Sequence, residues 1–124
     1  MAVGLDEITR CHEVAMAACG DNATRLGADA AARLKRLLQL AAMRDADGAL
    51  VTVAATVVAL VRSQAYETGN LRTALVLAAV MLQRYGLQPP RDWVEVAEAL
   101  AGMSYGNPQT AVQAVAALLA PEPR

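Results

Sequence analysis

The sequence predicts an all-α fold. Apolar residues recur at spacings of three and four along most of the chain, which is the period of a helix with one buried face. No segment shows the clean alternation of apolar and polar residues that a half-buried strand requires. The chain has 124 residues, 56% hydrophobic and 19% charged, which is typical of one globular domain. We therefore expect a single domain over residues 1–124, a compact bundle of six helices around a central buried helix.

Six segments carry the helical pattern, and they cover residues 5–18, 29–44, 49–63, 69–85, 92–102 and 108–120. The first segment offers Ile8, Val14 and Ala15 to a core, and Gly20 is placed to end it. In the second segment, five apolar residues share one side of the helix, and the basic residues fall largely away from it. The five are Leu34, Leu37, Leu38, Ala41 and Ala42.

The third segment is apolar on nearly every side, although many of its residues are β-branched. Its length of about fifteen residues favours a helix over a strand, and its alanines suit close helix packing. The fourth segment starts at Gly69 and stops at Gly86, and its apolar residues extend around most of the cylinder. That distribution predicts that the fourth helix is the central one, surrounded by the others.

Two consecutive prolines, at positions 89–90, separate the fourth helix from the fifth. Asp92 and Glu95 have the spacing of a capping box, which indicates where the fifth helix starts. Asn107 followed by Pro108 is a cap and first-turn pair for the last helix. These signals define the starts of the two C-terminal helices.

Composition argues against a membrane or nucleic-acid role. The longest nearly unbroken apolar stretch, residues 49–61, is shorter than the roughly 20 residues that a bilayer requires. Residues 1–10 have no apolar run behind a basic cluster, so they do not resemble a signal peptide, and we expect a cytoplasmic protein. A formal net charge of −1, scattered basic residues and few aromatics predict no nucleic-acid partner.

Four further side chains are candidates for a disulfide, a metal site or a contact with a partner. Cys11 and Cys19 are eight residues apart in one helix, or roughly 12 Å, so we expect two reduced, buried packing residues and no disulfide. A zinc site at His12 would need more ligands than Cys19 provides, so we expect His12 on the helix surface. Trp93 is expected to close the core, with an anchor for a partner peptide as the alternative.

The most polar stretch within the expected core is residues 64–74, between the two most apolar helices. A loop that leads into a buried helix presents free N–H groups, which together with the helix dipole favour an anion such as phosphate. Gly69 lets the backbone approach closely, Asn70 can bond or cap, and Arg72 can bind phosphate oxygens in two places. The alternative is structural: Thr68 or Asn70 caps the helix, Gly69 permits the turn, and position 72 is a surface charge.

Residues 69–74, Gly-Asn-Leu-Arg-Thr-Ala, resemble the second half of the Fic family motif, His-x-Phe-x-Asp/Glu-Gly-Asn-x-Arg. The resemblance is strongest to the Doc branch, in which Lys-Arg-Thr-Ala commonly follows the Asn. It continues in Arg62 before the motif, in Arg-Tyr-Gly at positions 84–86, in the total length, and in the short helix and final helix that follow. The similarity covers residues 51–119 and implies a Fic/Doc-like fold.

The resemblance also implies a transfer chemistry. Fic and Doc proteins move a nucleotidyl or phosphoryl group from a nucleotide triphosphate, with Mg²⁺, to a hydroxyl on a protein. In that scheme the family His is the base, the acidic residue holds the metal, and Gly69, Asn70 and Arg72 cradle the phosphates. Gln64 stands at the base position and Thr68 at the metal position. An amide cannot accept a proton near neutral pH, and loss of a general base typically costs about 100- to 10,000-fold in rate.

These replacements, with Leu71 where Doc has Lys, predict an inactive or altered transferase: a binding module of toxin–antitoxin origin that keeps a phosphate-binding loop. The alternative is an active phosphotransferase or nucleotidyltransferase, with Gln64 orienting the nucleophile and Thr68 binding Mg²⁺. A third reading is a purely structural helical scaffold. The resemblance further implies an antitoxin or other protein partner, and a Tyr66 ring that fills the core where the family has Phe.

Overall fold

The computed structural model describes residues 3–102 and 107–120. Within these ranges the chain forms six α-helices and one short 3-10 turn, and it contains no strand. They are α1 (Leu5–Ala18), α2 (Ala28–Ala42), the turn η1 (Asp45–Asp47), α3 (Ala49–Ser63), α4 (Asn70–Arg84), α5 (Trp93–Gly102) and α6 (Pro108–Leu119). The predicted all-α bundle is confirmed, and the expected helix ends agree to within about two residues.

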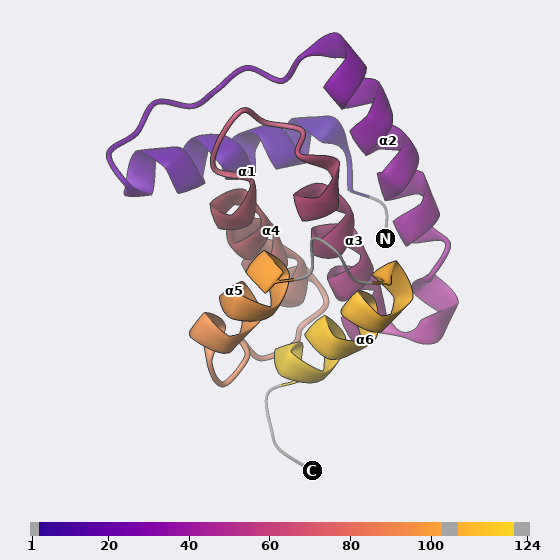
Figure 1. Ribbon diagram of the computed structural model, residues 1–124. Helices are drawn as coiled ribbons and strands as arrows, with labels where there is room; N and C mark the ends of the chain where they lie inside the picture. Colours follow the sequence, from indigo (N-terminus) through magenta and orange to yellow (C-terminus); the bar gives the residue numbers. More distant parts are fainter. Residues whose placement is uncertain (1–2, 103–106, 121–124) are drawn as a thin grey trace.

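The centre of the bundle is occupied by α3, with α2, α4 and α6 packed around it (Figure 1). Eleven of the 15 residues of α3 are buried, whereas α4 buries seven of its 15 and keeps one side toward solvent. The expected central position of the fourth helix is therefore wrong, because its apolar residues extend farther around the cylinder than its neighbours cover. Among the described residues, no helix combines the length and the apolarity that crossing a bilayer requires.

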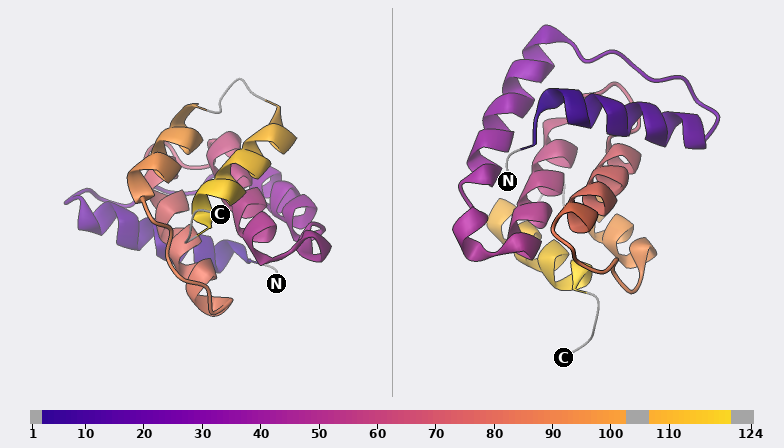
Figure 2. Two further views of the ribbon diagram at one scale, coloured as in Figure 1. Left: turned by 90° about the horizontal axis from the view of Figure 1, so that it is seen from below. Right: turned by 180° about the vertical axis from the view of Figure 1, so that it is seen from behind.

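α1 crosses the end of the bundle where α3 stops and α4 starts, and residues 19–27 connect it to α2 along the outside (Figure 2). Val14, expected in the core, is 58% exposed because it lies beside the buried stripe of α1 and not on it. The stripe follows the i, i+3, i+4, i+7, i+8 spacing of one helix face. Its members are Ile8, Cys11, His12, Ala15 and Met16.

The two cysteines differ in environment. Both thiols are free, as expected, but only Cys11 is buried. Cys19 is exposed, because α1 ends at Ala18 and the chain turns toward solvent there. Burial, with a contribution from the negative charge of Glu7, raises the pKa of the Cys11 thiol.

Side chains start α5 and α6 where the sequence places them. The Asp92 carboxylate accepts a hydrogen bond from the Val94 N–H at 2.9 Å, and Asn107 Oδ1 accepts one from the Gln109 N–H at 2.8 Å. Trp93 is partly buried and packs against the core, which agrees with its expected role in closing the domain. These two helices cover α4 and α3 on the side away from α1 (Figure 2).

Candidate functional site

The polar stretch singled out by the sequence forms the connection between α3 and α4. α3 ends at Ser63, whose carbonyl oxygen accepts two hydrogen bonds from the Arg33 guanidinium of α2, at 3.2 Å from Nε and 2.9 Å from Nη2. Gln64 follows with a left-handed φ of 49°, and its Nε2 donates to the Val61 carbonyl at 3.0 Å. Gln64, at the position where the sequence resemblance would place a catalytic base, is therefore an exposed amide that helps to end a helix.

Asn70 closes this connection by bonding to the backbone of Tyr66. Its Oδ1 accepts from the Tyr66 N–H at 3.0 Å, and its Nδ2 donates to the Tyr66 carbonyl at 2.8 Å. Asn70 is 8% exposed and Tyr66 is 2% exposed, with the Tyr66 ring in the core as expected. Asn70 thus shapes the loop through both ends of its amide.

Gly69 is required by the packing of α1 as well as by the backbone. It has a φ of +80°, and a Cβ built on it would lie 2.4 Å from Met16 Sδ, which is closer than real Cβ atoms come to other heavy atoms. The Met16 side chain, from the buried face of α1, thus occupies the space that a side chain at Gly69 would need.

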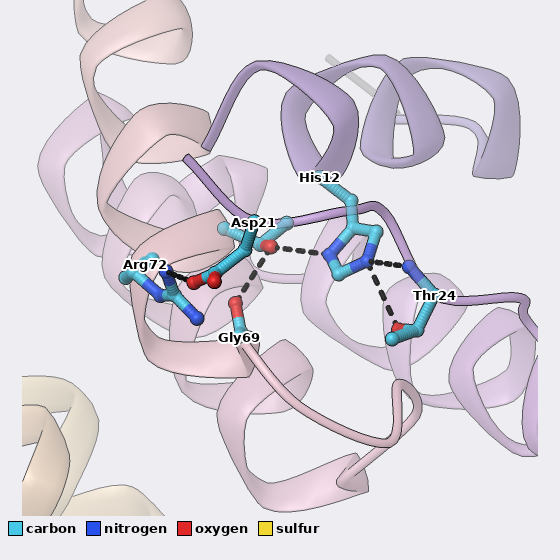
Figure 3. A network of polar contacts seen from close by, with 6 residues as sticks. His12, Asp21, Thr24, Gly69 and Arg72 are labelled. Carbon is cyan, nitrogen blue, oxygen red and sulfur yellow. Dashed lines mark hydrogen bonds and ion pairs between the residues drawn. The ribbon is translucent and has the colours of Figure 1, made fainter. Parts of the chain in front are cut away.

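Arg72, in the first turn of α4, forms an ion pair with Asp21 of the α1–α2 connection (Figure 3). The distance from Nη1 to Asp21 Oδ2 is 2.8 Å, and the two side chains are 34% and 52% exposed. The Asp21 carboxylate raises the pKa of the Arg72 guanidinium further above its usual range. The guanidinium binds a carboxylate here through the same kind of charged hydrogen bond that would bind phosphate.

The start of α4 adds backbone donors to this guanidinium. The first backbone hydrogen bond of the helix runs from the Thr73 N–H to the Gly69 carbonyl, at 2.9 Å. The N–H groups of residues 70–72 precede it, so they have no acceptor within the helix. With the helix dipole they favour negative charge at this end, in the arrangement that the sequence predicts for an anion site.

Mg²⁺ does not fit the residues at this position. Thr68 is exposed and supplies one neutral hydroxyl, whereas Mg²⁺ is usually held by carboxylates in an octahedral set of oxygens. The Asp21 carboxylate is already paired with Arg72. In the part of the chain that the structure describes, no group of three or more His, Cys, Asp or Glu side chains could hold a metal ion. A metal-assisted step therefore has no support in the donor set of this loop.

His12 is buried behind Gly69 with 1% of its surface exposed, so the expected surface position is wrong. Its Nε2 accepts a hydrogen bond from the Thr24 N–H at 3.0 Å, and its Nδ1 lies 2.9 Å from Thr73 Oγ1 (Figure 3). Because an amide N–H can only donate, Nε2 carries a lone pair and the neutral ring holds its proton on Nδ1. That proton is donated to Thr73, whose hydroxyl donates to the Gly69 carbonyl at 2.7 Å.

The surroundings of His12 keep it neutral at pH 7. Burial lowers the pKa of the imidazole, the positive charge of Arg72 lowers it further, and Glu13 acts in the opposite direction. The ring stacks on Tyr66, with centroids 3.8 Å apart and planes 8° apart. With both nitrogens engaged inside the protein, His12 has no lone pair or proton to offer a ligand.

The comparisons with known proteins give no relative. No family model, curated protein or solved structure matches this chain. A Fic/Doc assignment therefore rests on the sequence resemblance over residues 51–119, which is strongest at residues 69–74.

The structure brings Gly69, Asn70 and Arg72 together at the start of α4, and it adds two residues that the sequence did not indicate. Asp21 and Thr24 reach this region from the α1–α2 connection, and they carry no motif or helical spacing of their own. A cavity of about 720 Å³ lies elsewhere, and its described lining comes from the start of α1 and from α2.

Proposed function

We propose that this chain is a Doc-like, Fic-fold protein of toxin–antitoxin origin that binds a phosphate-bearing ligand without transferring it. The supporting observation is the Arg72–Asp21 ion pair, in which a guanidinium beside a helix N-terminus binds an anionic group of the chain itself. Phosphate carries more charge and more acceptor oxygens than a carboxylate, so it can compete with Asp21 for the same donors. An antitoxin or another protein partner belongs to this proposal, because a toxin–antitoxin origin implies one.

The residues at the catalytic positions favour binding over catalysis. Gln64 cannot take up a proton near neutral pH, and its amide nitrogen is used on the Val61 carbonyl. Thr68 and Leu71 bring no charge to the metal and phosphate positions. His12, the single histidine of the sequence, is buried with both ring nitrogens bonded. A pseudoenzyme that keeps the anion-binding half of the site accounts for this combination.

Titration with ATP and GTP, with and without Mg²⁺, tests the proposal by calorimetry and by NMR shifts of the backbone amides. We expect shifts at residues 69–72, and we expect the Arg72→Gln variant to lose at least about tenfold in affinity, since a charged hydrogen bond contributes about 1.5–3 kcal/mol. Arg36→Gln, an exposed arginine of α2, is the matched control and should bind as the unmodified chain does. The absence of shifts at residues 69–72 with either nucleotide would remove the proposal.

A surviving transferase is the competing function, and a second experiment separates it from binding alone. The protein is incubated with nucleotide triphosphates radiolabelled at the α or γ position, with a cell lysate, and with Mg²⁺ or Mn²⁺. A binding module leaves no label on any protein. A labelled target that disappears in the Gln64→Ala variant would show that transfer persists.

A further inference from the structure

The α1–α2 connection is fastened to the start of α4 at two places. The Thr24 N–H is hydrogen-bonded to the His12 ring, which is hydrogen-bonded in turn to Thr73 of α4. Asp21 forms an ion pair with Arg72 (Figure 3). We propose that His12 is a proton-controlled latch: the neutral ring holds the Thr24 backbone N–H, and the protonated ring releases that N–H and places a positive charge beside Arg72. This inference deepens the proposed function and rests on it for the effect on anion binding, but not for the latch itself.

The latch works in the neutral state because each ring nitrogen has one suitable partner. Nε2 accepts from the Thr24 N–H at 3.0 Å, and it also lies 3.1 Å from the Thr24 hydroxyl, which can rotate to donate to it. The Nδ1 proton goes to Thr73, which is fully buried. Since the neutral ring is the only form that offers an acceptor at Nε2, the position of Thr24 depends on its protonation state.

Protonation of Nε2 places an N–H group 3.0 Å from the Thr24 nitrogen, where a donor then faces a donor. The Thr24 hydroxyl can turn and accept the new proton, but the Thr24 backbone N–H has no such freedom. It loses its acceptor and must move away to bond to water. Residues 22–25 are free to do so, because they lie between Asp21, whose N–H is bonded to the Met16 carbonyl, and the helix that starts at Ala28.

Charged and aromatic groups face the ring from each element packed against it. Arg72 of α4 opposes an imidazolium, Glu13 of α1 favours it, and the face of Tyr66 in the α3–α4 loop attracts a cation. Burial and Arg72 outweigh Glu13, so that the pKa of His12 is lowered. The fourth neighbour, the α1–α2 connection, presents Thr24 directly and Asp21 through its pair with Arg72.

A positive charge on His12 should strengthen anion binding at the start of α4. It adds charge behind the start of α4, close enough to Arg72 for the two groups to interact, and an anion bound there relieves their repulsion. Protonation of His12 and anion binding therefore strengthen each other, because coupling between two sites is reciprocal. We expect anions to bind more tightly as the pH falls.

The single histidine of the sequence makes the latch directly measurable. NMR of the ¹⁵N-labelled chain should show the Nδ1–H tautomer at pH 7.5 and protonation of the ring only below its ordinary pKa of 6.5. Over the range in which the ring titrates, exchange of the Thr24 amide, corrected for its intrinsic pH dependence, should accelerate by up to about tenfold per pH unit, since opening is linked to one proton. Exchange of the Thr24 amide that does not follow the His12 titration would overturn the latch.

Two variants separate a latch from a merely buried histidine. Thr24→Val removes the hydroxyl that can receive the Nε2 proton but keeps the backbone N–H, so His12 should titrate at a lower pH than in the unmodified chain. His12→Gln keeps one donor and one acceptor and cannot be protonated, so exchange of the Thr24 amide should lose its pH response. An unchanged His12 titration in Thr24→Val contradicts the latch even if His12→Gln does not fold.

Sulfate, whose charge is constant between pH 5 and 7.5, tests the link to the anion site. We expect it to bind at least about fivefold more tightly at pH 5.5 than at pH 7.5, a coupling of about 1 kcal/mol, and to lose this dependence in His12→Gln. Asp21→Asn frees Arg72 at every pH and serves as the reference.

If Asp21→Asn binds sulfate and the affinity of the unmodified chain for sulfate does not rise in acid, the coupling is wrong while the proposed function stands. If exchange follows the His12 titration but neither protein binds sulfate or ATP, the latch stands and the proposed function fails.

Discussion

The side chain of Asn70 is bonded at both ends to the backbone of Tyr66, accepting from its N–H at 3.0 Å and donating to its carbonyl at 2.8 Å. This reciprocal pair closes the loop through which the chain enters α4. Because Asn70 is buried, no solvent is at hand to replace either bond. The shape of the loop, and with it the position of the first turn of α4, therefore depends on one amide group.

Replacing Asn70 should destabilise the whole protein. Asn70→Asp keeps an acceptor for the Tyr66 N–H but loses the donor to the carbonyl, and we expect the free energy of unfolding to fall by about 1–3 kcal/mol. Asn70→Ala leaves both backbone groups unpaired and should cost roughly 2–4 kcal/mol. Urea unfolding followed by circular dichroism measures both. Asn22→Ala, at an exposed position, should change the value by less than about 0.5 kcal/mol, and an equally small effect of Asn70→Ala would contradict this role.

Gly69→Ala should lower the free energy of unfolding by more than the left-handed backbone of this glycine alone explains. Gly20 has a nearly equal φ, +74° against +80°, but no atom within 4 Å of its would-be Cβ, so Gly20→Ala isolates the backbone term of about 1 kcal/mol. Gly69→Ala adds the contact with Met16 Sδ, for which overpacking implies about 1–3 kcal/mol more. Thermal and urea unfolding of both variants give the difference.

The double variant Gly69→Ala/Met16→Ala identifies the source of that difference. Truncating Met16 leaves room for the new methyl group, so the two substitutions should together cost less than the sum of their separate effects. Equal costs for Gly69→Ala and Gly20→Ala would show that Met16 adapts freely and that only the backbone matters.

The helices could be predicted from the sequence because the signals that define them are local. α3 has the bounds Ala49–Ser63 that its apolar run indicates, and α6 starts at Pro108 directly after the Asn107 cap. The position of each helix in the bundle is harder to predict from the sequence. α3 and α4 are both apolar around most of their surface, and only the packing of α2 and α6 makes α3 the central one.

The candidate site could be predicted only in part, since half of it comes from distant segments. Gly69, Asn70 and Arg72 lie within four residues and can be predicted from the sequence. Asp21, the partner of Arg72 in the α1–α2 connection, is 51 residues away, and Thr73, the partner of His12 in α4, is 61 residues away. The burial of His12 did leave a signal. It falls on the apolar stripe of α1, and counting it as a core position would also have placed Val14 outside.

The two cysteines should differ sharply toward a thiol reagent. Cys19 is exposed, whereas Cys11 is buried and has a raised pKa, so less of it is thiolate at neutral pH. Ellman's reagent at pH 8 should modify one thiol per folded chain at once and the second only on unfolding. Mass spectrometry locates the modified residue, and Cys19→Ser should abolish the fast phase. A fast phase that survives in Cys19→Ser would contradict the burial of Cys11.

The buried imidazole should make global stability depend on pH in the acid direction. The pKa of His12 is lowered from its ordinary 6.5, chiefly by burial, so the unfolded chain binds a proton more readily than the folded one. The contribution of neutral His12 to the free energy of unfolding is therefore complete above about pH 6.5. It is lost as the pH falls toward the pKa of His12 in the folded chain. The slope is at most about 1.4 kcal/mol per pH unit, because a single proton is involved.

His12→Gln provides the matched control for this dependence, because it keeps a donor and an acceptor but has no titration of its own. We compare the urea midpoints of both proteins between pH 7.5 and 5.5. The difference between the two midpoints should be constant above pH 6.5. It should shrink below pH 6.5, because the unmodified chain loses stability there and the variant does not. The window stays above the range in which most carboxylates titrate, so that they contribute little to the difference. Parallel curves for the two proteins would mean that His12 has the same proton affinity in the folded and unfolded chains, which its hydrogen bonds to Thr24 and Thr73 argue against.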